Sequence, residues 1–182
     1  MLKFFCSKKN NKGFTLIEAL IVIFIMSLLA VSILASYKNS NKKYILLQAN
    51  QKIISDLRKV QNMAINGTEI EGYCSTVDAC FGYGIKFDLT LPSSYIIFAD
   101  RNGNQTYNGG EGFETVNLPS NIIIQSVSPS PKAHVFFEAP DPTTYVNGDS
   151  GASASAEIVI QIQGTALTKT INVNTAGLIE NN

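Results

Sequence analysis

The stretch KKNNKGFTLIEALIVIFIMSLLAV (residues 8–31) determines how this chain of 182 residues is organised. Residues 14–35 contain no Lys, Arg or Asp and a single acidic residue, Glu18. A helix over this segment would be about 33 Å long at roughly 1.5 Å per residue, which is enough to cross a hydrocarbon core of about 30 Å. We therefore expect residues 14–35 to form a membrane-spanning helix.

Lysines precede the apolar run and predict its orientation. Residues 1–13 contain four lysines and no acidic residue. Lysines beside a membrane segment favour the cytoplasmic side, so we expect a cytoplasmic N-terminus and a head in the periplasm or outside the cell. Of 14 basic and 14 acidic residues, 10 basic and 14 acidic lie beyond this stretch. This balance and the absence of a basic cluster give no indication of a nucleic-acid surface, and they leave DNA binding open.

Two other interpretations of the apolar run fit it less well. A cleaved secretory signal has an apolar region of about 7–15 residues that ends in a small-residue cleavage site. This run is longer, and Ala30 and Ala35 match such a site only loosely. A plain uncleaved anchor explains the length but not Glu18, because an ionisable residue inside a membrane is costly and usually functional.

The segment KGFTLIE (residues 12–18), followed by the apolar run, resembles the N-terminal signal of type IV pilins and type II secretion pseudopilins. The resemblance implies that residues 1–13, with Cys6, are a basic leader. It implies that a prepilin peptidase and methyltransferase cuts between Gly13 and Phe14 and N-methylates Phe14. Gly13 suits such a cut because a backbone without a side chain can be held closely.

The same resemblance gives Glu18 a partner. Glu18 is the fifth residue of the implied mature chain, one helical turn from the new amine of Phe14. In the family this carboxylate pairs with the amine of a neighbouring subunit, which neutralises both charges and fixes the register of stacked subunits. The alternative is that Glu18 reaches the headgroups or is protonated.

Beyond the membrane segment, the sequence predicts that the helix continues to about residue 65. Apolar residues recur at spacings of three and four, as in a helix packed along one face; they are Leu46, Ala49, Ile53, Leu57, Val60 and Ala64. Asn66-Gly67 is a good helix stop. The expected organisation is a leader (1–13), a membrane half of the helix (14–35), an amphipathic half (36–66) and a β-rich head (67–182).

After Gly67 the sequence changes to short β-like runs between clusters of Pro, Gly, Asn and Ser. We predict a flexible loop over residues 148–156. The predicted strands cover residues 81–89, 95–100, 121–127, 133–138, 157–163 and 169–174. The fold class is therefore α+β, with a long N-terminal helix packed on a C-terminal antiparallel β-sheet.

The layout is similar to the minor pseudopilin of the H type and to related minor pilins, whose heads carry segments like residues 95–104 and 171–180. Many major pilins have a Pro about 22 residues into the mature chain, whereas this chain has Ala35 there and no Pro in the predicted helix. The resemblance therefore favours a minor subunit. The partners it implies are the processing enzyme, other pilin or pseudopilin subunits and an inner-membrane assembly platform.

Cys74 and Cys80 lie close together in the part expected outside the cytoplasm, where a disulfide is reasonable. The loop between them is short, so we expect a modest stabilisation of about 2 kcal/mol. Two free thiols are the alternative. The spacing is a poor zinc signature, because no further Cys or His lies nearby.

The segment DRNGNQTYNGGE (residues 100–111) follows the pattern of a calcium loop. Positions 1, 3, 5, 7, 9 and 12 supply ligands in such a loop, and these are Asp100, Asn102, Asn104, Thr106, Asn108 and Glu111. Gln105 stands where Gly is usual, and only two candidate ligands are charged, so binding would be weak, about 0.1–1 mM. Calcium is the one cofactor that the sequence suggests, and an ordinary hairpin loop is the alternative.

No motif in the sequence indicates an enzyme. His134, the only histidine, lies in the apolar run AHVFFEA and is expected to be a strand residue. Neither a nucleophile elbow nor a phosphate-binding glycine pattern is present. We expect a structural subunit of a type IV pilus or type II secretion pseudopilus. The alternative is a membrane-anchored module that binds calcium or another ligand outside the cytoplasm and does not polymerise.

Overall fold

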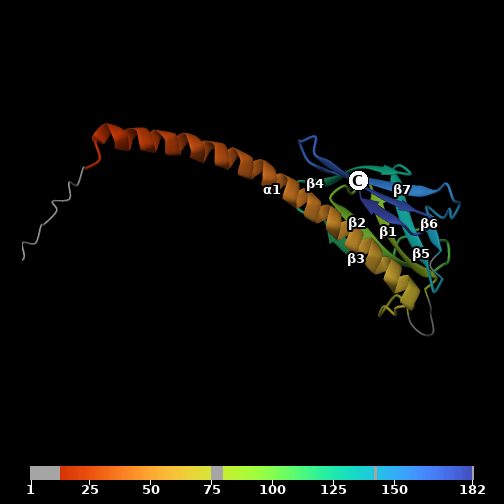
Figure 1. Cartoon of the computed structure of the whole chain (residues 1–182). Coiled ribbons are helices and arrows are strands. Elements are labelled where there is room, and N and C mark those ends of the chain that lie inside the picture. The colour runs from red at the N-terminus through yellow and green to blue at the C-terminus, as the bar shows by residue number, and fades with distance from the viewer. Residues whose placement is uncertain (1–12, 75–79, 142, 182) are drawn as a thin grey trace, which may run out of the picture. The chain divides into compact units, whose positions relative to one another are not determined.

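The computed structural model describes residues 13–74, 80–141 and 143–181. Within these ranges the chain has one helix and nine strands, which makes the fold α+β as expected (Figure 1). The chain forms two compact units, residues 1–41 and 42–182, and helix α1 (Leu16–Asn66) contributes to both. The strands are β1 Gly82–Asp88, β2 Ser94–Asp100, β3 Gly112–Asn117, β4 Ile122–Ser128, β5 Lys132–Glu138, β6 Thr144–Val146, β7 Ser155–Ile162, β8 Thr168–Asn174 and β9 Ile179–Asn181.

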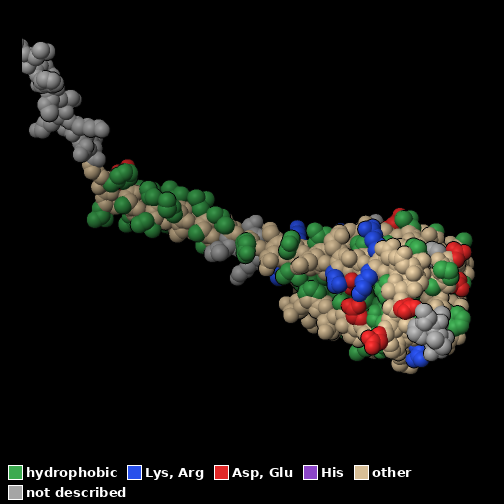
Figure 2. Space-filling model, turned by 90° about the horizontal axis from the view of Figure 1, so that it is seen from below, with side chains coloured by type: hydrophobic (Ala, Val, Ile, Leu, Met, Phe, Trp, Pro, Cys, Tyr) green, Lys and Arg blue, Asp and Glu red, His purple; other side chains and the backbone are tan. Residues whose placement is uncertain are grey.

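The first unit contains the apolar part of α1. Among the described residues, Leu16–Ile33 is the one helical segment long and apolar enough to cross a membrane, and none of it is buried within the chain. Figure 2 shows hydrophobic side chains covering this part of the helix. The expected apolar helix is therefore present, and its side chains are exposed in the described part of the chain.

In the second unit, the helix packs on the head along the predicted stripe. All six stripe residues are at most 4% exposed, namely Leu46, Ala49, Ile53, Leu57, Val60 and Ala64. The helix ends at the predicted stop. Gly67 has a φ of 56°, its amide donates to Ala64 (3.2 Å), and the amide of Thr68 donates to Met63 (3.1 Å). These two bonds form a Schellman motif, which satisfies carbonyls at the end of the helix.

The head is antiparallel β, as expected, but its strands form two sheets where the sequence analysis described one. One sheet has the order β3-β2-β1-β5-β6 and the other the order β4-β7-β8-β9. The division arises at β4, which pairs with β7 (Ile122 opposite Ile162) and does not join β3 or β5. The buried faces of both sheets and the helix stripe form one hydrophobic core.

The six predicted strands are all present, and three further strands were not predicted. β6 and β9 have three residues each, and β3 reads GFETVN with mostly half-exposed side chains. None of these offers an apolar alternation long enough to identify a strand. At the start of the predicted loop, Gly148 and the preceding Asn147 have positive φ, and β7 begins at Ser155, within the range assigned to the loop.

A second hydrophobic cluster lies on the opposite face of the first sheet. Phe98 and Phe136 are fully buried there, although they do not belong to the main core. Their rings stack, with centroids 6.4 Å apart, and they occupy the space above Gly82 and Gly84 of β1. β1 is consequently buried on both faces.

Candidate functional site

The proposed cleavage site precedes the helix. Gly13, Phe14 and Thr15 are exposed residues outside α1, and a side chain built on Gly13 would meet no atom within 4 Å. Phe14 is 78% exposed. The peptide bond between Gly13 and Phe14 is therefore free of neighbouring structure in the described chain, as a proteolytic site requires.

Thr15 caps the helix, a role that the sequence analysis missed. The backbone amide of Glu18 donates to the Thr15 hydroxyl at 3.3 Å, and the amide of Ala19 donates to the Thr15 carbonyl at 3.2 Å. Thr15 and Glu18 have the spacing of a capping box, and a carboxylate in the first turn interacts favourably with the helix dipole. The T-x-x-E spacing was the signal that could have revealed this.

The capping position gives Glu18 a second, purely structural role. A carboxylate in the first turn stabilises the helix start whether or not it binds an amine of another subunit. The substitution Glu18→Ala therefore removes two effects at once. A test of the pairing has to separate them, and Thr15→Ala does so because it removes the cap and retains the carboxylate.

The residues at the two ends of the predicted calcium loop are buried carboxylates. Asp100 ends β2 and is 0% exposed, and Glu111 precedes β3 and is 5% exposed. Asp100 accepts hydrogen bonds from the amides of Asn102 (3.0 Å), Gly103 (2.8 Å) and Gln105 (2.8 Å). Backbone amides thus hold the loop around this carboxylate.

The other end of the loop is held in the same way. Glu111 accepts hydrogen bonds from the amides of Asn108 (2.7 Å) and Arg101 (3.3 Å). None of the ion pairs found among the described residues involves Glu111 or Asp100. Both carboxylates are therefore buried with neutral hydrogen-bond donors.

The polar side chains between these two residues form local turns. The side-chain oxygens of Asn102 and Asn104 accept from the amides two residues further on, at 3.1 and 3.0 Å. Gln105 has a φ of 58°, the left-handed conformation for which calcium loops usually have Gly. No group of three His, Cys, Asp or Glu suited to a metal occurs in the described part of the chain. These local turns are those of a hairpin loop, and calcium binding stays a prediction.

The loop packs on the second hydrophobic cluster through Tyr107. The Tyr107 ring lies edge-on to Phe98, with centroids 5.6 Å apart, and Lys86 Nζ lies 4.8 Å from the centre of the Tyr107 ring. The amide of Tyr107 donates to Nδ1 of His134 at 3.2 Å. His134 is thus a strand residue, as its sequence context predicted, and it also holds the loop, which was not predicted.

His134 is kept neutral by its surroundings. Burial, with the nearby charges of Lys86 and Lys132, lowers the pKa of His134 to about 4. A neutral imidazole can accept the Tyr107 amide at Nδ1, whereas the protonated ring cannot. Nε2 of His134 is buried and has no hydrogen-bond partner among the described residues.

The predicted disulfide is confirmed. Cys74 and Cys80 are bonded, with Cα atoms 5.3 Å apart. The backbone of Cys74 also pairs with Ile70 in an isolated bridge. The disulfide links the segment that follows the helix to the residues just before β1, and the bridge closes a turn within that segment.

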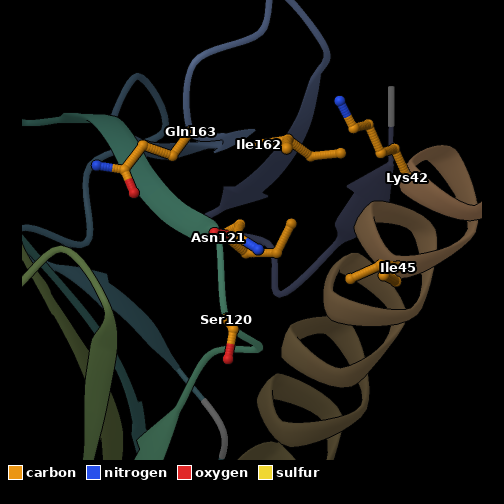
Figure 3. A pocket seen from close by; sticks show the side chains of 7 residues that line it. Lys42, Ile45, Ser120, Asn121, Ile162 and Gln163 are labelled. Atoms are coloured by element: carbon orange, nitrogen blue, oxygen red, sulfur yellow. The ribbon is translucent and has the colours of Figure 1, made fainter. Parts of the chain in front are cut away.

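Pockets of the head gather around the first turns of its helix. The pocket in Figure 3 has a volume of about 280 Å³. Lys42 and Ile45 line it from the helix, opposite Ser120, Asn121 and Gln163. Lys42 is the one titratable side chain among the residues that line it.

Comparison with known proteins identifies the N-terminal segment. Residues 8–34 match a family model described as the prokaryotic N-terminal methylation motif. No curated protein and no solved structure matches the chain. Proteins with this type of motif are structural and not enzymatic, and the motif implies processing by a peptidase and assembly with other pilin subunits. The chain therefore carries a type IV pilin-like signal, joined to an apolar helix that fits a membrane-anchored pilin.

Proposed function

We propose that the protein is a minor pilin or pseudopilin, a structural subunit of a type IV pilus or a type II secretion pseudopilus. The observation that carries this proposal is the methylation motif at residues 8–34, continuous with a helical segment whose apolar side chains have no cover in the chain. Such a surface needs lipid or other helices around it. Moving from lipid into a bundle of neighbouring helices is the assembly step that this surface allows.

The accessible Gly13–Phe14 bond supports processing at that position. The leader would be removed on the cytoplasmic side, and the new Phe14 amine would lie one helical turn from Glu18. Intact-mass measurement of the chain, expressed with and without a prepilin peptidase, tests this step. We expect a mature chain that begins at methylated Phe14, and any other mature N-terminus would contradict the proposal.

Assembly is tested separately from processing. In cells with the assembly machine, we expect Glu18→Ala to abolish incorporation into filaments and to leave membrane insertion intact. Thr15→Ala is the matched control, because it weakens the helix cap and keeps the carboxylate. If both variants lose assembly equally, Glu18 acts through the helix cap and not through an intersubunit pair.

The proposed position is that of a minor subunit. In support of this, α1 runs through Ala35 without interruption, whereas many major pilins have a helix-bending Pro at the corresponding position. We therefore expect the protein at low copy number relative to the major subunit in purified filaments. Quantitative mass spectrometry of such filaments checks this, and an abundance equal to that of the major subunit would contradict it.

Calcium binding is a second candidate function, and the burial of Asp100 and Glu111 with neutral donors favours it. Two buried negative charges would gain from a cation, and binding would stabilise the head. We expect calcium at about 1 mM to raise the melting temperature, and Glu111→Gln to remove that increase. A melting temperature independent of calcium would leave the loop as an ordinary hairpin loop.

A further inference from the structure

One end of the head unit is formed by four segments that are distant in sequence. They are the first turns of the head's helix and three turns between strands, namely residues 42–52, 88–94, 117–122 and 162–169. Backbone hydrogen bonds join the three turns: Leu118 to Ser93 (2.9 Å), Ile124 to Pro92 (2.7 Å) and Gln163 to Asn121 (2.7 Å). Pockets between these turns and the helix are lined from both sides, as Figure 3 shows for Lys42 and Asn121. We call these four segments the basic end.

The basic end carries almost no free negative charge. All its residues are described, and Asp88 is the one acidic residue among them. Asp88 is 4% exposed and pairs with Lys86 (3.0 Å) and Lys132 (3.4 Å). Its charge is therefore neutralised inside the head.

Three of the four lysines of the basic end take part in no ion pair among the described residues. Lys52 pairs with the buried Asp56 at 2.7 Å, whereas Lys42, Lys43 and Lys169 take part in none of the ion pairs found among the described residues. Lys42 and Lys43 are exposed and Lys169 is half-buried. Lys43 and Lys169 line the same pocket, so helix and sheet contribute charge to one surface.

Large apolar and aromatic side chains are exposed among these lysines. Tyr44 is 65% exposed, Leu91 50% and Leu47 44%. A surface that combines lysines with tyrosine and leucine is typical of proteins that rest on a membrane interface. Some turns at the opposite end of the head contain exposed carboxylates instead, with Glu69, Glu71 and Asp141 among them.

The chain itself keeps the basic end close to a membrane. Nine helical residues lead from Ile33, the last residue of the apolar span, to Lys42, a rise of about 13 Å. Even fully extended, nine residues reach no further than about 32 Å. The headgroup region adds roughly 5–8 Å to each side of the hydrocarbon core. With the helical rise, Lys42 lies no more than about 8 Å beyond the headgroup region, so the long side chains of Lys42 and Lys43 can reach the headgroups when the span is inserted.

We propose that the basic end binds the anionic phospholipid headgroups of the membrane in which Leu16–Ile33 is inserted. This contact holds the head against the bilayer while the subunit is stored there, before any assembly. A second copy of the chain is the rival occupant, because its carboxylates could meet the same lysines. The lipid is favoured, because the chain tethers every inserted subunit to it, whereas no described feature brings another copy's opposite end to these lysines.

The inference rests on the membrane insertion of α1 and not on filament formation. The chain has no Trp, so a single introduced Trp reports on its own position. Leu91→Trp places this reporter at the basic end, far in sequence from the span. Phe81→Trp is the matched control, because Phe81 is 53% exposed and lies at the opposite end of β1.

The full-length variants are reconstituted in vesicles of brominated phosphatidylcholine, with or without about one-third phosphatidylglycerol. Bromine quenches Trp only at close range. We expect the Leu91→Trp emission to fall at least about two-fold more in the anionic vesicles than in the neutral ones, and to recover at about 0.5 M salt. The Phe81→Trp emission is expected to stay the same in both.

Replacing Lys42, Lys43 and Lys169 by Gln in the Leu91→Trp protein should abolish the quenching. Each lysine near an anionic surface is worth about five-fold in binding, so three give about a hundredfold. The proposal is overturned if Leu91→Trp is not quenched in anionic vesicles, or is quenched to the same extent in neutral ones. It is also overturned if Phe81→Trp is quenched as strongly as Leu91→Trp, or if the Gln substitutions leave the quenching unchanged. Failure of the chain to float with neutral vesicles overturns the membrane anchor as well, so the two failures are distinguishable.

Discussion

The hydroxyl of Tyr95 in β2 donates a hydrogen bond to the carboxylate of Asp56 in α1, with the two oxygens 2.6 Å apart in the interior of the head. Asp56 is 2% exposed and also accepts from Lys52 at 2.7 Å. Burial, followed by the hydrogen bond to Asp56, raises the pKa of Tyr95 above its usual range. The phenol therefore stays protonated and can donate to Asp56, and the pair ties the helix to the first sheet.

Removing this hydroxyl should destabilise the head. In Tyr95→Phe the ring still packs against Phe87, but the buried Asp56 loses a donor. An under-satisfied buried carboxylate costs about 1–3 kcal/mol. Urea denaturation of the full chain in detergent should show a loss of this size. Tyr44→Phe, in which the side chain is 65% exposed, is the control and should unfold like the unmodified protein.

Gly84 of β1 should tolerate no side chain. A Cβ there would lie 2.5 Å from the Phe98 ring and 2.7 Å from the carbonyl oxygen of Val135, which is backbone and cannot move aside. We expect Gly84→Ala to lower the free energy of unfolding by about 1–3 kcal/mol, as overpacking does. Gly109→Ala, where a Cβ meets no atom within 4 Å, should be neutral. Equal stability of the two variants would contradict the close packing of the second hydrophobic cluster on Gly84.

The lowered pKa of His134 leads us to expect that mild acidification destabilises the head. Its pKa is about 4 in the folded protein against an ordinary 6.5, so between these values the unfolded chain binds a proton that the folded chain does not. Stability is therefore complete above about pH 6.5 and decreases as the pH falls toward 4. Urea denaturation at several pH values in this window should show a steeper decrease for the unmodified protein than for His134→Gln.

The difference between those two proteins isolates His134, because other carboxyl groups titrate in both. Asp88 affects the stability of the head in a lower pH range. Burial favours its protonated form, but hydrogen bonds from Thr90 and the nearby Lys86 outweigh burial and hold the pKa of Asp88 below 3.8. The stability that it provides is lost only below that value. Identical pH dependence of both proteins between 6.5 and 4 would contradict the role of His134.

Reduction of the Cys74–Cys80 disulfide should weaken the head modestly. The bond closes a short loop, for which the expected stabilisation is about 2 kcal/mol. Denaturation with and without a reductant should differ by about this amount in the full chain. The double variant Cys74→Ser/Cys80→Ser should match the reduced protein and no longer respond to the reductant.

The sequence predicted the features that depend on local periodicity. The helix stripe from Leu46 to Ala64, the Gly67 stop and the six longer strands all follow from patterns of a few residues. The division into two sheets did not follow, because the pairing of Ile122 with Ile162 joins residues 40 apart that no local pattern connects. β9 was missed because three residues are too few to carry an alternation.

In the candidate site, too, contiguous motifs could be predicted from the sequence and contacts between distant residues could not. The methylation signal is a contiguous motif, so Gly13, Phe14 and Glu18 could be identified from the sequence. The capping role of Thr15 was overlooked, although its spacing to Glu18 is that of a capping box and could be seen in the sequence. The amide bonds to Asp100 depend on the fold of the whole loop, and the support of this loop by His134 comes from a strand 27 residues beyond Tyr107.

The two aromatic rings above Gly82 and Gly84 give the head a second layer that can open by itself. The loop with Tyr107 lies on Phe98, which stacks on Phe136, whereas the helix packs against the other face of β1. Detachment of the loop would therefore expose apolar rings to water and leave the helix-facing core closed. A local opening of this kind would appear as fast hydrogen exchange in the loop and as binding of a hydrophobic dye, at denaturant concentrations where the helix is still fully protected.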